Sequence, residues 1–140
     1  MNRVIKFRYR YTNGTNWIFQ VFTLAEICNG MPFEVLSDNP LLKNYRYDGE
    51  DLFSSLTDKH GVEIYEGDVL VSTFGNGLPF VIKFGEYHDS SGDDDLATAI
   101  GFYILEQDGT ESLFGKSVNG DTDCYQVIGN VFQNLSTNHL

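Results

Sequence analysis

The side chains that could carry out chemistry are few and scattered along the chain. The histidines are His60, His88 and His139, and the cysteines are Cys28 and Cys124. Nucleophilic catalysis needs a histidine beside a serine or cysteine, together with an acid that orients it. No local spacing supplies that arrangement, and His60 stands before a glycine in a turn, where a solvated role is expected. We therefore expect no catalytic residue and no enzymatic activity.

One short acidic stretch comes close to the spacing of a cation site. Asn119, Asp121 and Asp123 match the first three ligands of a calcium loop. The pattern then fails, because Cys124 stands where the loop requires glycine and Asn130 where it requires a bidentate glutamate. The cysteines also lack the CxxC partners of a zinc site. We expect no metal site and no cofactor, and the pattern leaves any ligand unknown.

Charge is distributed unevenly over the chain. The net charge is −11 and the isoelectric point is about 4.4, so direct nucleic-acid binding is not expected. Residues 86–123 hold ten acids against one base, Lys116, which gives −9 of the total. The acids of this segment are Glu86, Asp89, Asp93, Asp94, Asp95, Glu106, Asp108, Glu111, Asp121 and Asp123. We expect solvated loops here, including residues 89–95, "DSSGDDD". The N-terminal strand holds four of the nine bases, and we expect them on a solvated strand face; they are Arg3, Lys6, Arg8 and Arg10. A sharper alternative is head-to-tail self-association with the basic N-terminal strand, or mimicry of a polyanion.

No segment predicts export or a membrane. The N-terminus, "MNRVIKFRYR", is charged and alternating, without the apolar stretch of a signal peptide. No apolar run approaches the roughly 20 residues that span a bilayer. We expect a cytoplasmic protein with reduced thiols and no membrane contact.

The N-terminal part predicts a β-hairpin followed by one short helix. Residues 5–11 alternate between apolar and charged side chains, and an apolar strand returns at 17–21. Asn13-Gly14 between them suits a tight hairpin turn. Thr23 and Glu26 have the spacing of a capping box, and a glycine at position 30 can end the helix. Residues 31–51, which include Pro32 and the turn signal Asp48-Gly49, are expected to be an irregular, loop-rich connector with at most one short strand.

From residue 52 onward the sequence predicts short strands separated by turns. The candidate strands lie in "DLFSSLTD", "VEIY", "DVLVS", "LPFVIKFGEY", "AIGFYIL", "TESLFGK" and "YQVIGNVF". Short strands at this spacing are typical of a small barrel or sandwich. Glu66-Gly67-Asp68 is expected to join two paired strands, with Val62, Ile64, Val69 and Val71 on one apolar face. The Asp68 side chain is expected to accept hydrogen bonds from neighbouring backbone N–H groups.

Three segments together resemble the YopX family of phage and prophage proteins. They are the opening "IKFRYRYTNGTNWIF", the hallmark segment "LTDKHGVEIYEGDVLVS" at residues 56–72, and the ending segment "YQVIGNVFQN" at 125–134. The chain departs from the family pattern at Ser55, a position near the hallmark segment where a glycine after a threonine is frequent, and at Leu135, where a proline usually follows the final asparagine. The resemblance implies a β-rich protein with an SH3-like barrel in its C-terminal part. It implies no known activity and transfers no catalytic residue.

We therefore expect a mainly β protein with two parts. Residues 1–51 would form the hairpin, the helix and the connector, and residues 52–140 the SH3-like barrel, with the alternative that both form one compact unit. The expected function is that of a phage- or prophage-encoded accessory protein, a non-enzymatic protein-interaction module that forms a homo-oligomer and has a protein partner not identified by the sequence. The alternative is an acidic nucleic-acid mimic that blocks a host DNA-binding protein.

Overall fold

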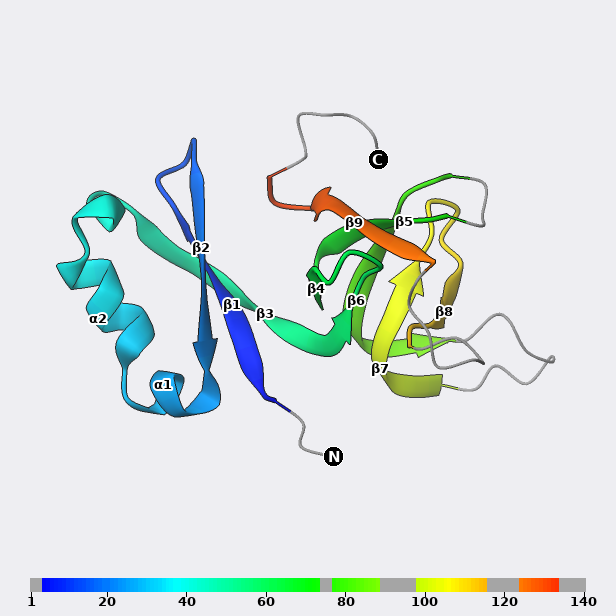
Figure 1. Cartoon of the computed structure of the whole chain (residues 1–140), viewed down its shortest axis with the longest axis horizontal. Helices are drawn as coiled ribbons and strands as arrows, with labels where there is room; N and C mark the ends of the chain where they lie inside the picture. Colours follow the sequence, from blue (N-terminus) through cyan, green and yellow to red (C-terminus); the bar gives the residue numbers. More distant parts are fainter. Residues whose placement is uncertain (1–3, 74–76, 89–97, 116–123, 134–140) are drawn as a thin grey trace. The chain divides into compact units, whose positions relative to one another are not determined.

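The protein is mainly β, with its strands in two antiparallel sheets (Figure 1). The computed structural model describes residues 4–73, 77–88, 98–115 and 124–133. The chain divides into two compact units, Met1–Ser55 and Leu56–Leu140. No helix within the described residues is long and apolar enough to cross a bilayer.

The first unit begins with the predicted hairpin. Strand β1 (Lys6–Thr12) pairs antiparallel with β2 (Trp17–Thr23), and Thr12 lies opposite Trp17. The connecting loop is longer than a two-residue turn, and the Asn13 side chain holds it. Its Oδ1 accepts hydrogen bonds from the backbone N–H groups of Thr15 and Asn16, at 2.9 and 2.7 Å. An asparagine at this position thus fixes the loop through its own side chain.

Helix α1 (Leu24–Cys28) confirms the predicted capping box. The Thr23 side chain accepts from the Glu26 N–H, and the Glu26 carboxylate accepts from the Thr23 N–H at 2.8 Å. A second helix, α2 (Met31–Asp38), follows where an irregular connector was expected, so that prediction is wrong here. Pro32 lies in its first turn, where the missing N–H breaks no helical hydrogen bond. The proline therefore starts a helix in this context.

Strand β3 (Arg46–Thr57) is longer than predicted and passes from the first unit into the second. It is preceded by a short 3-10 helix, η1 (Pro40–Leu42). Asp48-Gly49 is a β-bulge and not a turn: Arg10 lies opposite Gly49 and Tyr11 opposite Tyr47, so the register shifts between them. Gly49 has φ +143°, and a side chain there would collide with the Arg10 guanidinium. A bulge keeps the strand going while adding one residue.

The core of the first unit lies on one face of its strands. Tyr9, Tyr11, Phe22 and Leu42 are buried there, and residues of both helices pack against them. The Tyr11 hydroxyl donates a 2.8 Å hydrogen bond to the Pro32 carbonyl. Burial, together with nearby Tyr9, raises the pKa of Tyr11 to about 12. A buried tyrosine with a partner for its hydroxyl adds packing area without an unpaired polar atom.

The second sheet has the order β8-β7-β6-β5-β9. Its strands are β5 (Asp68–Ser72), β6 (Phe80–His88), β7 (Thr98–Leu105), β8 (Glu111–Leu113) and β9 (Tyr125–Asn130). Its core is built on Ile64, Leu70, Phe80, Ile82 and Phe114. The described residues form an open sheet, so the closed SH3-like barrel is not confirmed.

The outer edge of β9 explains why the two end strands do not meet. Lys59 donates its backbone N–H to the Tyr125 carbonyl at 3.1 Å, and the Asp58 carboxylate accepts the Val127 N–H at 2.9 Å. The turn that contains Asp58 therefore occupies the edge that a closing strand would need. Strand β8, with three residues, is also too short to cover β9 along its length.

Strand β4 (Glu63–Tyr65) corrects the predicted hairpin around Glu66-Gly67-Asp68. The first sheet has the order β2-β1-β3-β4, so β4 and β5 belong to different sheets and do not pair. The expected apolar face is confirmed only in part. Ile64 and Val69 are buried as expected, but Val62 is 48% exposed, and Leu70 on the other face of β5 is fully buried. Both faces of the start of β5 are buried, so a simple alternation does not describe it.

Candidate functional site

The histidines and cysteines singled out by sequence do not assemble into a catalytic group in the described part. His60 is exposed in a turn, and His88 is exposed at the end of β6, with its Nδ1 3.2 Å from the Thr98 hydroxyl. Cys28 and Cys124 form no disulfide. No group of three or more acids, histidines and cysteines among the described residues is placed to hold a metal ion. His139, the Asn119–Asp123 stretch and the 89–95 loop lie outside the described residues.

The structure does bring together the polar residues of the hallmark and ending segments. Asp58 is one of them and is 5% exposed. Its Oδ1 accepts hydrogen bonds from the N–H groups of His60 and Val62, at 2.8 and 3.0 Å. Its Oδ2 accepts from Val127 in β9 at 2.9 Å. One carboxylate thus shapes its own turn and fastens that turn to the last strand.

These hydrogen bonds control the ionisation of Asp58. Burial alone would raise the pKa of this carboxyl, because it penalises the charged form. The N–H groups of Val127, Val62 and His60 donate to the carboxylate, and together with the nearby His60 side chain they lower the pKa below its ordinary value. Asp58 is therefore held as an anion, with the donors it needs already in place.

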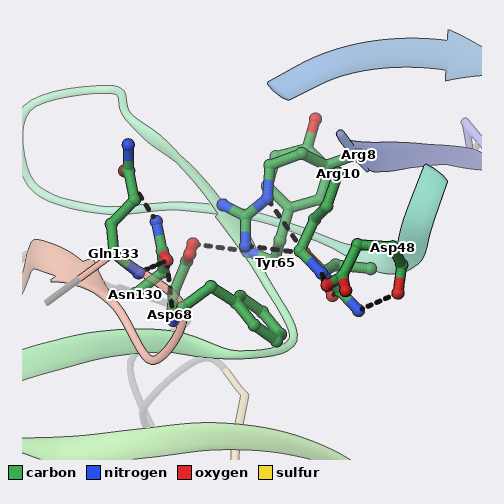
Figure 2. A network of polar contacts seen from close by, with 9 residues as sticks. Arg8, Arg10, Asp48, Tyr65, Asp68, Asn130 and Gln133 are labelled. Atoms are coloured by element: carbon green, nitrogen blue, oxygen red, sulfur yellow. Dashed lines mark hydrogen bonds and ion pairs between the residues drawn. The ribbon is translucent and has the colours of Figure 1, made fainter. Parts of the chain in front are cut away.

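The turn at Glu66-Gly67-Asp68 is held from three sides. Asp68 is 2% exposed, and its Oδ2 accepts the Tyr65 N–H at 2.8 Å (Figure 2). The Gly67 N–H donates to the Ile82 carbonyl at 2.7 Å, and its carbonyl accepts the Val131 N–H at 2.9 Å. The sequence prediction that Asp68 accepts from a neighbouring backbone N–H is confirmed.

Asn130 closes the ending segment in the same way. It lies opposite Asp68 across β5 and β9, and it is 8% exposed. Its Oδ1 accepts the N–H groups of Phe132 and Gln133, at 3.0 and 2.9 Å, and its Nδ2 donates to the Gln133 side chain (Figure 2). Asn130 therefore builds the turn that follows β9.

Asp58, Asp68 and Asn130 thus use side-chain oxygens on backbone N–H groups of turns. Donors and acceptors used in this way fix local backbone geometry. Sequence reasoning identified the role of Asp68 but missed those of Asp58 and Asn130. The local signal for Asp58 was present, because an aspartate three residues before a glycine is typical of such turns. No local signal indicated its bond to Val127, which lies 69 residues away.

A cluster of charged side chains lies on β1 and β3 in the first unit. Arg8 donates from Nε and Nη2 to Asp51 Oδ2, at 3.1 and 3.0 Å. Arg10 pairs with the other Asp51 oxygen through Nη1, and its Nε lies 3.2 Å from Asp48 Oδ2 (Figure 2). The arginine side chains are 12% and 11% exposed, and that of Asp51 is 3% exposed.

This cluster corrects the prediction of a solvated basic face on the first strand. Arg8, Arg10, Asp48 and Asp51 sum to zero charge and pair with one another, so the two arginines are not an open cationic surface. The Arg8 guanidinium also lies 5.2 Å from the centroid of the Phe19 ring. Paired arginines of this kind give little support to a head-to-tail attraction between copies or to a cationic groove.

The second unit also has a shallow hollow of about 430 Å³. It is lined by Pro79, Val81, Leu105, Glu106 and Gln107. Three of the five lining residues are apolar, and the one carboxylate, Glu106, is exposed. An acyl- or phosphoryl-transfer site would need a nucleophile and a base to converge in such a place. These lining residues supply no such pair.

Comparison with known proteins identifies the family. The model of the YopX family, described as "YopX protein", matches residues 47–136. That range covers more than half of the chain and contains the Asp58 turn, the Gly67–Asp68 turn and the Asn130 turn. A search of curated proteins finds no match to the chain. The chain belongs to the YopX family.

Proposed function

We propose that the chain is a phage- or prophage-encoded accessory protein that acts in the cytoplasm as a non-enzymatic protein-interaction module. The observation that carries the proposal is the use of Asp58, Asp68 and Asn130. In the matched region these three buried polar residues are bound to the backbone of turns. They support a scaffold, so function would depend on the surfaces that the scaffold presents.

Exposed apolar side chains support a role in protein contacts. On β6 and β7, Phe84 lies opposite Phe102, and Ile100 lies two residues along the same face. Ile100 is 79% exposed and Phe84 is 43% exposed, and the Phe84 and Phe102 rings meet edge to face at 4.8 Å. A cluster of exposed large apolar side chains is a common mark of an interaction surface.

The same patch supports the proposal of a homo-oligomer. The paired arginines weaken the electrostatic argument for head-to-tail association, so the proposal of an oligomer now depends mainly on apolar contact. Replacing Ile100 with serine is expected to shift the protein toward the ~16 kDa monomer in light scattering at high concentration. A chain that is already monomeric at every concentration would contradict the oligomer.

The alternative, an acidic nucleic-acid mimic, is favoured by the charge of residues 86–123. Of its ten acids, Glu86, Glu106, Asp108 and Glu111 lie within the described residues. Glu86 lies opposite Ile100, whereas Glu106 follows the other end of β7, so these two are about 20 Å apart along the strands. Changing Asp93, Asp94 and Asp95 to asparagine tests the proposal, since mimicry requires weaker partner binding and a flatter salt dependence.

An affinity capture from host cells, followed by mass spectrometry, tests the interaction module. The capture is run in parallel with the parent chain, with Ile100→Ser, and with Glu50→Gln as a control at an exposed position on β3. The proposal expects a protein that binds the chain again when both are purified, with a fixed stoichiometry. Turnover of a small-molecule substrate by the purified chain, lost without loss of folding when one side chain is changed, would overturn it.

A further inference from the structure

Strand β2 lies at the open end of the first sheet, and its outer edge offers backbone groups for pairing. The Leu24 N–H donates to the Ile5 carbonyl, which continues the β1–β2 register and sets its alternation. Residues 18, 20 and 22 then bond to β1, while residues 19 and 21 point their N–H and C=O groups outward. Thr23 fits this alternation, because its N–H turns away from β1 to the Glu26 carboxylate. Within the described part of the chain, no backbone partner reaches the outward groups of Phe19 and Val21.

The composition of β2 is unusual for an exposed edge. Its sequence, "WIFQVFT", holds no charged residue and no proline. Edge strands commonly carry lysine, proline or a bulge, which prevent unwanted pairing. An uncharged edge of seven residues is the kind of strand to which another strand adds.

A hollow of about 340 Å³ lies where β2 and helix α2 meet. It is lined by Gln20 from β2 and by Glu34, Val35, Asp38 and Asn39. Gln20 lies on the same face of β2 as core residues Ile18 and Phe22, which is the face that the helices cover. In Figure 1, α2 runs beside β2. A strand added to β2 would therefore direct every second side chain toward α2.

The two carboxylates at the hollow have no cationic partner among the residues that the structure describes. Glu34 and Asp38 are exposed, and no described base pairs with either of them. They lie four residues apart on the helix, where like charges repel. Asp38 also lies in the last turn of α2, which holds no basic residue and where the helix dipole disfavours an anion. A cation at the hollow would relieve both effects.

We propose that the outer edge of β2 receives an extended segment of a partner protein, in which basic residues alternate with apolar ones. The basic side chains pair with Glu34 and Asp38, and the apolar ones lie beside Phe19 and Val21 on the opposite face. The spacings agree: four residues of helix rise about 6 Å, and two residues of strand about 6.7 Å. This inference rests on the proposed interaction function and gives it a surface and a partner chemistry.

A second copy of this chain is a poorer occupant of the same edge. Pairing β2 with β2 of another copy would bring two sets of Glu34 and Asp38 to one place, and each chain already carries a net charge of −11. Repulsion of this kind disfavours association. A basic strand has no such penalty, so charge complementarity selects it.

The probe is a fluorescent nine-residue peptide in which lysine alternates with valine, measured by anisotropy against the full chain at low salt. Its control has the same composition with the lysines side by side. The alternating peptide is expected to bind more tightly, and added salt is expected to weaken it. Changing Glu34 to glutamine and Asp38 to asparagine together should weaken it by about fivefold, as expected for two exposed ion pairs. The matched charge control, Glu50→Gln with Asp108→Asn, should leave binding unchanged.

The edge itself is tested with proline. Val21→Pro removes an N–H that points outward, a change that edge strands tolerate. It should reduce peptide binding by at least about tenfold relative to Val21→Thr, which keeps the N–H, while a thermal melt shows whether both variants fold. The inference is overturned if the two peptides bind equally well. It is also overturned if neither Val21→Pro nor the Glu34/Asp38 double change alters the affinity for the alternating peptide. A concentration-dependent dimer that Val21→Pro abolishes would also overturn it in favour of a second copy. In either case, if the Val21→Pro variant captures the same host protein as the parent chain, the proposed interaction function is retained and its binding surface lies elsewhere.

Discussion

The carboxylate of Asp58 accepts the backbone N–H of Val127 at 2.9 Å, across 69 residues of chain. Its other oxygen accepts the N–H groups of His60 and Val62 within its own turn. Asp58 therefore binds both its own turn and strand β9, and so it links two segments of the matched region that are far apart in the sequence. One buried carboxylate thus helps to hold the hallmark segment and the ending segment together.

Replacing Asp58 with asparagine is expected to lower the free energy of unfolding by about 1–3 kcal/mol. The amide oxygen can still accept from His60 and Val62, but the amide nitrogen would face the Val127 N–H, donor against donor. Chemical denaturation followed by tryptophan fluorescence measures the change. The variant should remain folded, since its own turn is preserved.

Asp108→Asn is the matched control for Asp58→Asn. Asp108 is exposed in the turn after β7, and its carboxylate accepts the backbone N–H of Thr110 at 2.9 Å. Asparagine can accept the same bond, so the denaturation midpoint should not move. Equal losses in both variants would show that the amide itself, and not the bond to Val127, causes the effect.

Asp58 also predicts how stability changes with acid. The folded state lowers the pKa of Asp58 below its unfolded value, so the unfolded chain takes up the proton first. The stabilisation is complete above the unfolded value of about 4 and is lost as the pH falls through the lower folded pKa. We expect denaturation midpoints to fall below about pH 4, with a shallower fall in Asp58→Asn. Hydrogen bonds from Thr110 also lower the pKa of Asp108, so part of the pH dependence of stability remains in Asp58→Asn. Parallel curves for the two chains would contradict the assignment.

The hairpin, the short capped helix and the strands of the second sheet could be predicted because their signals are local. Alternation placed β1 and β2, the Thr23–Glu26 spacing placed α1, and apolar runs between glycine turns placed β6 to β9. Each of these patterns is decided by residues within a few positions of one another. The same reasoning identified the Gly67–Asp68 turn, although not the sheets that it connects.

The errors occurred where distant residues decide the outcome. Pro32 and Asp48-Gly49 suggested a loop, but a proline in a first helical turn and a glycine at a bulge serve regular structure instead. The arginines of β1 looked solvated, because nothing in their neighbourhood reveals that Asp51 lies opposite Arg8. The prediction of a closed barrel is not confirmed for a similar reason: the turn that contains Asp58, which is distant in sequence, occupies the edge of β9.

Gly67→Val is expected to destabilise the protein, and Gly61→Val separates its two causes. Both glycines have positive φ, +87° and +81°, so valine at either place costs about 1–3 kcal/mol in backbone strain. Only at Gly67 would a Cβ also meet another side chain, with the Phe132 ring 3.0 Å away, whereas the space beside Gly61 is open. Gly67→Val should therefore be the more destabilised of the two in urea denaturation. Equal midpoints for Gly67→Val and the parent would contradict the role of this turn.

The opposite change, Ser55→Gly, is expected to stabilise the protein. Ser55 is exposed within β3 and has φ +71°, a left-handed backbone that costs a residue with a side chain about 1–2 kcal/mol. Glycine removes that strain but adds about 0.5–1 kcal/mol of unfolded-chain entropy, so the net gain is about 0.5 kcal/mol. Thr57→Gly, in the same strand without positive φ, has no strain to relieve and should lose stability. A rise in denaturation midpoint for Ser55→Gly with a fall for Thr57→Gly would tie the gain to the backbone of Ser55. A fall in both would show that the side chain of Ser55 contributes more than its backbone costs.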